Sequence, residues 1–79
     1  MKYVYLLRSL SNPKQRYIGL TSNLRQRLSD HNEGKSTHTL KFRPWKIETY
    51  VAFSDPEKAL KFERYLKTGS GWAFSEKRL

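Results

Sequence analysis

Residues 17–31 read YIGLTSNLRQRLSDH, and this stretch decides the fold of the chain. Its first residues are β formers, so a strand is predicted over residues 16–20. Thr21 and Ser22 are both good N-cap residues, because a hydroxyl can accept a bond from a free amide of the first helical turn. We therefore predict a strand, a capped turn and a helix over about residues 23–32.

This helix carries charged residues on the side that is expected to face the sheet. At about 100° per residue, Leu24 and Leu28 define the buried stripe, and the pattern ends near Gly34. Arg27 and His31 fall within or just beside that stripe. A guanidinium and an imidazole beside a strand are suited to handling phosphate.

Two further strands complete a small sheet. The side chains of residues 2–8 alternate between two faces and are rich in β formers, which predicts a strand. Residues 9–15 contain Ser-Asn-Pro, which predicts a surface turn. The strands at 2–8 and 16–20 are therefore expected to form an antiparallel hairpin. Residues 45–53 alternate over nine positions. They predict the third and longest strand, which we expect to form the spine of the core.

A second helix is predicted to begin near residue 55. Ser54 with Glu57 fits a capping box, whereas Asp55 with Pro56 fits an N-cap followed by proline at the first helical position. The two interpretations differ by one residue in the start of the helix.

This second helix is predicted to run to about Thr68, where Gly69 offers a stop, and residues 71–79 predict a short final helix. Glu63 lies inside the apolar arc, which is made of Ala59, Leu60, Phe62 and Leu66. A carboxylate on a buried face needs a partner or a role, because burying an unpaired charge is costly.

Length and composition limit the possible functions. At 79 residues the chain is expected to be a single domain over 1–79. The absence of cysteine excludes disulfides, cysteine-bearing zinc sites and a cysteine nucleophile. The longest early apolar run, residues 3–7, is too short for a signal peptide or a membrane span. We expect a cytoplasmic protein with no membrane contact.

Positive charge is concentrated in the N-terminal part. The net charge is +9, and residues 1–46 hold ten Lys and Arg against two acidic residues, whereas residues 47–79 hold six against five. This asymmetry points to a polyanionic partner, most simply nucleic acid, and a merely soluble basic surface is the open alternative. Charge itself does not distinguish DNA from RNA. The irregular basic loop at 35–43 is expected either to contact substrate or to be a plain surface loop.

Five residues from two strands and two helices are expected to converge on the sheet. They are Tyr5, Tyr17, Arg27, His31 and Glu63. Together they suit phosphodiester cleavage: a carboxylate for one divalent cation, a guanidinium for the phosphate, and phenol or imidazole to move protons. A hard ion, Mg²⁺ or Mn²⁺, held by one carboxylate fits the scarcity of other acidic ligands.

Each residue of this set also has a structural interpretation. Tyr5 and Tyr17 could be a cross-strand aromatic pair. Arg27 and Glu63 could form a structural ion pair. His31 could be a cation favoured by the dipole at a helix C-terminus.

The motifs YVYLL, YIGLTSNLRQRLSDHN, RPWK and ALKFERYLKTGSG together resemble the GIY-YIG nuclease superfamily, and most closely its small stand-alone members. Similar domains form the UvrC N-terminal nuclease domain and the catalytic domains of homing endonucleases. The resemblance spans nearly the whole chain. It implies an α+β fold with a three-stranded antiparallel sheet flanked by helices, in the order β-β-α-β-α-α.

The resemblance also implies metal-dependent phosphodiester hydrolysis by these residues. Tyr5 and Tyr17 match the two motif tyrosines, and either could be the general base or orient the attacking water. Arg27 matches the phosphate-binding arginine, His31 the His-or-Tyr position on the same helix, and Glu63 the ligand of a single metal ion.

The chain departs from the family pattern at three places. Tyr3 stands where the first motif has glycine, and Leu20 stands where some relatives have a lysine. No asparagine occurs between Arg64 and Leu79, where many relatives have one on a late helix.

We therefore expect a metal-dependent DNA endonuclease, and a substrate recognised by its shape is one option. The alternative is a nucleic-acid-binding module of the same fold with weak or no cleavage, acting on RNA or supported by a protein partner. Oligomeric state is open. The residues expected to contact nucleic acid are Arg16, Arg25, Lys35, His38, Thr39, Lys41 and Arg43.

Overall fold

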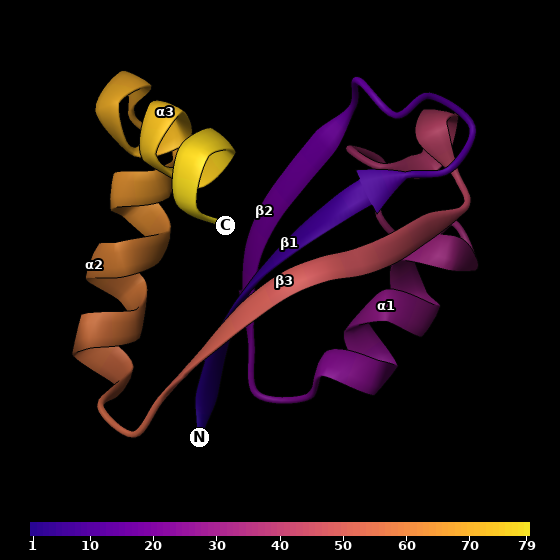
Figure 1. Cartoon of the computed structure of the whole chain (residues 1–79). Helices are drawn as coiled ribbons and strands as arrows, with labels where there is room; N and C mark the ends of the chain where they lie inside the picture. The colour runs from indigo at the N-terminus through magenta and orange to yellow at the C-terminus, as the bar shows by residue number, and fades with distance from the viewer.

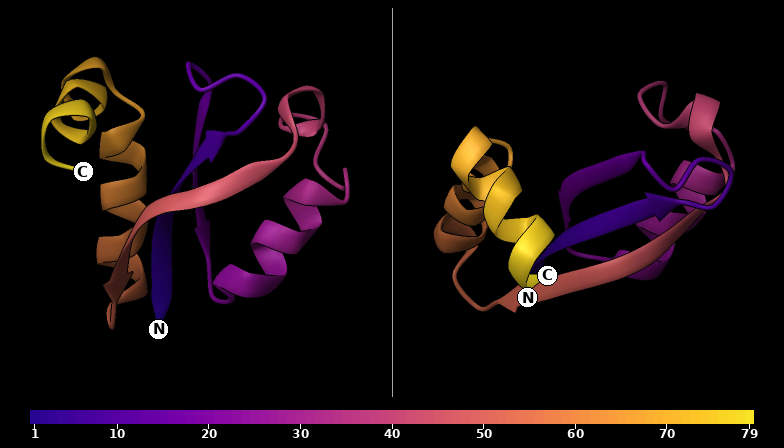
Figure 2. Two further views of the ribbon diagram at one scale, coloured as in Figure 1. Left: turned by 45° about the vertical axis from the view of Figure 1, so that its right-hand side comes forward. Right: turned by 45° about the horizontal axis from the view of Figure 1, so that its top comes forward.

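The computed structural model describes residues 1–79 and contains one three-stranded antiparallel sheet with helices on both sides. Figures 1 and 2 show α1 on one side of the sheet and α2 with α3 on the other. The predicted α+β fold and its element order are confirmed. The elements are β1 (Lys2–Ser9), β2 (Arg16–Thr21), α1 (Leu24–Asn32), a 3₁₀ turn η1 (Leu40–Phe42), β3 (Trp45–Phe53), α2 (Pro56–Leu66) and α3 (Gly69–Arg78).

The central strand is β1, in the order β2-β1-β3. The prediction that β3 forms the spine of the core was wrong, because β3 lies at an edge. Val4, Tyr5, Leu6 and Leu7 are buried without interruption, as expected for a strand covered on both faces.

A bulge divides β3 into two parts. Leu6 pairs with Thr49 but Leu7 pairs with Ile47, so Glu48 is an extra residue on β3. An extra residue shifts the side-chain alternation by one. Ile47 therefore packs on the α1 side of the sheet, whereas Phe53 packs on the α2 side.

Helix α1 begins one residue later than predicted. Its N-cap is Asn23, whose side chain accepts a hydrogen bond from the amide of Gln26 at 3.1 Å. The prediction of Thr21 or Ser22 as the cap was wrong. The Thr21 hydroxyl instead accepts from the amide of Asn23 at 3.1 Å, which shapes the turn that precedes the helix.

Asp55 caps α2 and Pro56 is its first residue, so the second of the two interpretations holds. The helix ends at Leu66, two residues earlier than predicted. Gly69 is not a stop but the first residue of α3, which Thr68 caps by accepting from the amide of Gly71 at 3.1 Å.

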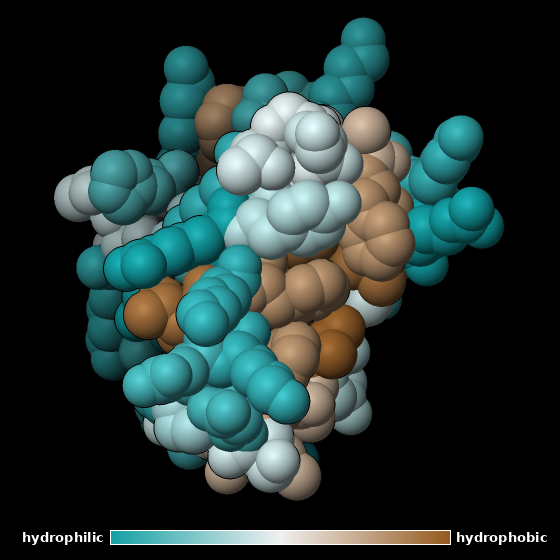
Figure 3. Space-filling view, turned by 90° about the vertical axis from the view of Figure 1, so that its left-hand side faces the viewer, coloured by the Kyte–Doolittle hydropathy of each residue, from teal (hydrophilic) through white to brown (hydrophobic).

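Two apolar clusters lie on opposite faces of the sheet. On the α2 side the buried residues are Val4, Leu6, Ile18, Ala59 and Leu66. On the α1 side they are Tyr5, Leu7 and Trp45, with Tyr17, Leu24, Leu28, Phe42 and Ile47 packed around them. Figure 3 shows that apolar atoms also reach the surface on the face formed by α2 and α3. No helix of the chain combines the length and apolarity needed to cross a membrane.

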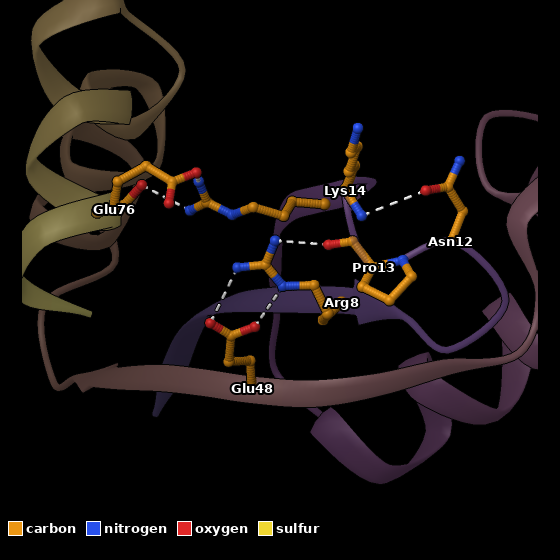
Figure 4. Close-up of polar contacts among 8 residues, drawn as sticks. Arg8, Asn12, Pro13, Lys14, Glu48 and Glu76 are labelled. Carbon is orange, nitrogen blue, oxygen red and sulfur yellow. Dashed lines mark hydrogen bonds and ion pairs between the residues drawn. The ribbon is translucent and has the colours of Figure 1, made fainter.

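Two arginines lie on the α2 side of the sheet. Arg8 donates to both carboxylate oxygens of Glu48, at 2.7 and 3.2 Å, and to the Pro13 carbonyl at 2.9 Å (Figure 4). The guanidinium of Arg16 bonds Ser75 at 2.6 Å, pairs with Glu76 and lies 4.1 Å from the centre of the Trp72 ring. Its side chain is only 2% exposed, so Arg16 anchors α3 to the sheet.

Candidate active site

The Tyr5 hydroxyl lies at the centre of the predicted site. Its oxygen is 3.0 Å from Nε2 of His31, and Nε of Arg27 donates to it at 3.3 Å. Tyr5 comes from the central strand, whereas Arg27 and His31 lie one turn apart on α1. Because they are four positions apart, both side chains point from α1 toward the sheet.

Gly19 makes room for the Tyr5 hydroxyl. The two residues are directly paired across β1 and β2, so their side-chain positions share a face. A Cβ on residue 19 would overlap the hydroxyl and ring of Tyr5. The glycine of the Tyr-Ile-Gly motif is therefore required by the close approach of this phenol.

His31 is fully buried, and both ring nitrogens have a partner. Nε2 faces the Tyr5 hydroxyl, and Nδ1 lies 2.7 Å from the hydroxyl of Thr39. Burial, followed by the positive charge of Arg27, lowers the pKa of His31 below its ordinary value. The imidazole is therefore neutral near pH 7, and it is not the exposed helix-end cation of the alternative interpretation.

Arg27 is half-buried and remains charged. Its bond to Tyr5 raises the pKa of Arg27 further above its already high value. Only Nε has a hydrogen-bond partner in the protein. The other four N–H donors of the guanidinium are available for phosphate oxygens.

Tyr17 lies beside His31, with their ring centroids 5.0 Å apart. It pairs with Leu7 rather than with Tyr5, so the two tyrosines are diagonal neighbours with centroids 6.4 Å apart. Tyr17 is half-buried, and its hydroxyl has no protein partner. The two phenols thus differ: the Tyr5 hydroxyl is fixed by two side chains, whereas that of Tyr17 is free.

Burial is the main cause that raises the pKa of Tyr5, and the hydrogen bond from Arg27 acts against it. Glu63 lies on α2, on the other side of the sheet from α1 (Figure 1), and forms no hydrogen bond or ion pair with the other four predicted site residues. The Glu63 side chain is 12% exposed and pairs with Lys67 at 2.6 Å. It does not pair with Arg27, so the structural Arg27–Glu63 ion pair is absent.

This donor set fits a hard divalent ion that keeps most of its own water. The chain contains no cluster of three or more His, Asp or Glu side chains that could enclose a metal. Mg²⁺ is usually bound by one or two carboxylates together with water and substrate oxygens, and it does not need a site built entirely from protein ligands. Glu63 is the residue that would hold such an ion.

The residues expected to contact nucleic acid separate into two groups. Arg25, His38 and Lys41 are exposed and form no ion pair, whereas Lys35 lies 3.5 Å from Asp30. Arg43 is exposed, but its guanidinium donates to the carbonyls of Leu40 and Asn32. Arg16 and Thr39 are covered, Arg16 by α3 and Thr39 beneath His31, so neither is placed to meet a ligand directly.

Sequence reasoning missed two residues that hold the site. Thr39 contacts His31, although it was expected to face the substrate. The Asn32 side chain accepts from the amide of Trp45 at 2.6 Å and donates to its carbonyl at 3.0 Å. The side-chain amide of Asn32 therefore links the end of α1 to the start of β3. Neither contact leaves a periodic signal in the sequence, because each depends on the path of the loop between the two elements.

The profile of the GIY-YIG catalytic domain matches residues 1–72. The "Structure-specific endonuclease subunit SLX1" of Debaryomyces hansenii is 44% identical over 81% of this chain and 20% of its own length. An SLX1 homolog from Giardia intestinalis is 37% identical over 77% of the chain and 18% of its length. The "Structure-specific endonuclease subunit SLX1" of Malassezia globosa is 42% identical over 75% of the chain and 14% of its own length.

The chain spans a fifth or less of the length of these relatives. The family profile, in contrast, covers nearly all of the chain, from the first strand into the last helix. The chain therefore belongs to the GIY-YIG catalytic domain family.

Proposed function

We propose that this protein is a metal-dependent endonuclease that hydrolyses phosphodiester bonds in DNA, with Tyr5, Tyr17, Arg27, His31 and Glu63 as its active centre. The observation that carries the proposal is the Tyr5 hydroxyl held between Nε of Arg27 and Nε2 of His31. This contact supports the proposal, because a guanidinium can bind phosphate and a neutral imidazole can accept a proton, and both lie within hydrogen-bond distance of one phenol oxygen.

Tyr5 is the phenol that we assign as general base. With a raised pKa it does not ionise by itself near neutral pH. It passes its hydroxyl proton to Nε2 of His31 as its oxygen takes a proton from the attacking water. The water oxygen bonds to phosphorus, the bond from phosphorus to the leaving oxygen breaks, and that oxygen takes a proton from solvent.

The other residues have separate roles. The free N–H donors of Arg27 bind the phosphate oxygens and stabilise their charge in the transition state. Tyr17, with its unpartnered hydroxyl beside His31, orients the water or the phosphate. A divalent ion at Glu63, Mg²⁺ or Mn²⁺, would supply Lewis-acid stabilisation of the phosphate when bound.

The substrate is proposed to be branched or otherwise defined by its shape. All three relatives carry the words "structure-specific endonuclease subunit" in their names, and a protein partner is proposed because those names describe subunits. The exposed Arg25 on α1 and Lys41 in the following loop add positive charge to the surface, and the exposed His38 lies in the same loop as Lys41. A surface of this kind binds the phosphate backbone without reading bases.

One observation favours a second candidate, a nucleic-acid-binding module without cleavage. Nζ of Lys67 forms an ion pair with the Glu63 carboxylate at 2.6 Å, so it competes with a metal ion for this ligand. If this pair persists in solution with substrate and metal, the chain binds nucleic acid but does not cut it.

A cleavage panel tests both candidates. Single-stranded, duplex and branched DNA and RNA are incubated with Mg²⁺, Mn²⁺ or chelator, using wild type, Glu63→Gln and Arg27→Ala. Glu57→Gln is the matched control, because this glutamate lies exposed on the same helix. The endonuclease predicts metal-dependent cleavage that Glu63→Gln and Arg27→Ala abolish and Glu57→Gln retains. Binding without cleavage by wild type and Glu63→Gln alike favours the module, and no binding even at low salt contradicts both.

A further inference from the structure

Thr39 is buried beneath the imidazole of His31, on the side away from Tyr5. Its hydroxyl oxygen lies 2.7 Å from Nδ1, and neither residue has measurable solvent exposure. A contact as short as this between two buried polar atoms is a hydrogen bond, and its direction depends on which ring nitrogen carries the proton.

The hydrogen-bond partners of Tyr5 determine that direction. Nε of Arg27 can only donate, so the Tyr5 oxygen accepts from it. The remaining partner of the buried phenol is Nε2 of His31, which must accept the Tyr5 hydrogen. A neutral imidazole has one ring hydrogen, so that hydrogen is on Nδ1 and points at Thr39.

The hydroxyl of Thr39 completes this chain of hydrogen bonds. It accepts from Nδ1 of His31 and donates to the carbonyl of Ser36 at 3.5 Å. In the opposite tautomer, Nε2 and Arg27 would both donate to the Tyr5 oxygen. The buried phenol hydrogen would then have no acceptor, which is unfavourable for a group that cannot reach water.

We propose that Thr39 is a positioning residue that acts together with Tyr5 and Arg27: by accepting the hydrogen on Nδ1, its hydroxyl stabilises His31 in the Nδ1–H tautomer and leaves Nε2 free to accept the proton of Tyr5. The catalytic consequence rests on the proposed function. The tautomer itself is a property of the protein without metal or nucleic acid, and it can be measured there.

The backbone around Thr39 holds the hydroxyl in place. The carbonyl of Thr39 accepts from the indole N–H of Trp45 at 2.9 Å and from the amide of Phe42 at 3.2 Å. Trp45 is itself fastened to the end of α1 by Asn32. The loop therefore presents one hydroxyl to His31 in a fixed geometry.

Comparison of Thr39→Val with Thr39→Ser tests this role. Valine keeps the shape but lacks the hydroxyl, whereas serine keeps the hydroxyl. The readout is the ¹⁵N NMR spectrum of the His31 ring in the metal-free protein, assigned with His38→Gln, since the chain has two histidines. Wild type and Thr39→Ser are expected to carry the hydrogen on Nδ1, and Thr39→Val is expected to populate the Nε2–H tautomer.

Kinetics supply a second readout. Thr39→Val is expected to lower kcat about 10- to 100-fold with KM unchanged, and Thr39→Ser to restore it. A wild-type spectrum with the hydrogen on Nε2 overturns the inference, even if Thr39→Val does not fold. So does an unchanged spectrum in folded Thr39→Val. If the wild-type hydrogen is on Nδ1 but no nucleic acid is cleaved, the tautomer assignment stands and the proposed function fails.

Discussion

On the α1 side of the sheet, polar side chains are buried in a continuous set of hydrogen bonds from Arg27 through Tyr5 and His31 to Thr39. On the α2 side, the five buried residues of the apolar cluster are all aliphatic, and the buried polar contact, between Arg16 and Ser75, lies apart from them beneath α3. Buried polar groups are costly unless satisfied, so each group on the α1 side is restricted to one orientation. The aliphatic side tolerates several arrangements of similar volume.

Apart from Glu63, which lies on α2 and is proposed to hold the metal, the two sides are expected to respond differently to substitution. Changes on the α1 side are expected to alter chemistry more than folding, whereas changes in the aliphatic cluster on the α2 side are expected to alter folding and leave the His31 tautomer unchanged. Four measurements test this division.

The largest effect is expected for Tyr5→Phe. Loss of the hydroxyl removes the proposed general base, so kcat for cleavage is expected to fall about 10²- to 10⁴-fold. Tyr3→Phe is the matched control on the same strand, because the Tyr3 hydroxyl has no hydrogen-bond partner in the protein. Wild-type activity in Tyr5→Phe would remove Tyr5 from the proposed mechanism.

Gly71→Ala is expected to destabilise the fold by about 1–3 kcal/mol. A Cβ there would overlap the carbonyl of Tyr65, where α3 crosses the end of α2. Gly69→Ala is the control in the same helix: it meets nothing within 4 Å and is expected to stabilise by up to about 1 kcal/mol. Urea unfolding measures both, and equal changes would contradict the close packing.

The pH dependence of cleavage is expected to follow His31. Protonation at Nε2 removes the proton acceptor, so kcat/KM falls up to tenfold per pH unit on the acid side. Because burial and Arg27 lower the pKa of His31, the midpoint is expected below the ordinary value of about 6.5. His38→Gln should leave this fall of kcat/KM at acidic pH unchanged. A midpoint above about 6.5, or loss of the fall in His38→Gln, would contradict the assignment to His31.

The smallest effect is expected for the Arg8–Glu48 pair on the opposite face. Their side chains are 22% and 29% exposed, so a double-mutant cycle of Arg8→Met and Glu48→Gln should give a coupling of about 0.5 kcal/mol. Urea unfolding at low and high salt measures it, and the coupling should decrease with salt. A coupling of several kcal/mol would show that the α2 side also depends on polar contacts.

The sequence predicted the type and order of the main elements, because their apolar periods are long and clear. It failed at the start of α1, where Thr21, Ser22 and Asn23 are all capping residues and only the turn geometry selects among them. It also assigned the wrong central strand. The uninterrupted apolar run at residues 3–7 was the available signal, since strands buried on both faces lose their alternation.

For the candidate site, the sequence placed Arg27 and His31 on the sheet-facing side of α1, and the structure confirms that placement. Their functional roles stay a prediction. Arg16 and Thr39 could not be placed correctly, because the contacts that cover them come from α3 and from the folded loop. Charge and loop position do not reveal burial by elements that are distant in sequence.

Because of the extra residue in β3, the inward side chains of this edge strand change from one face of the sheet to the other. Up to Ile47 they face the α1 side, where His31 lies, and from Thr49 onward they face the aliphatic cluster on the α2 side. Deleting Glu48 would remove no apolar residue, but it would turn the side chains of one half of the strand to the wrong face of the sheet. The bulge thus allows one short strand to line both the polar face that contains His31 and the aliphatic face covered by α2.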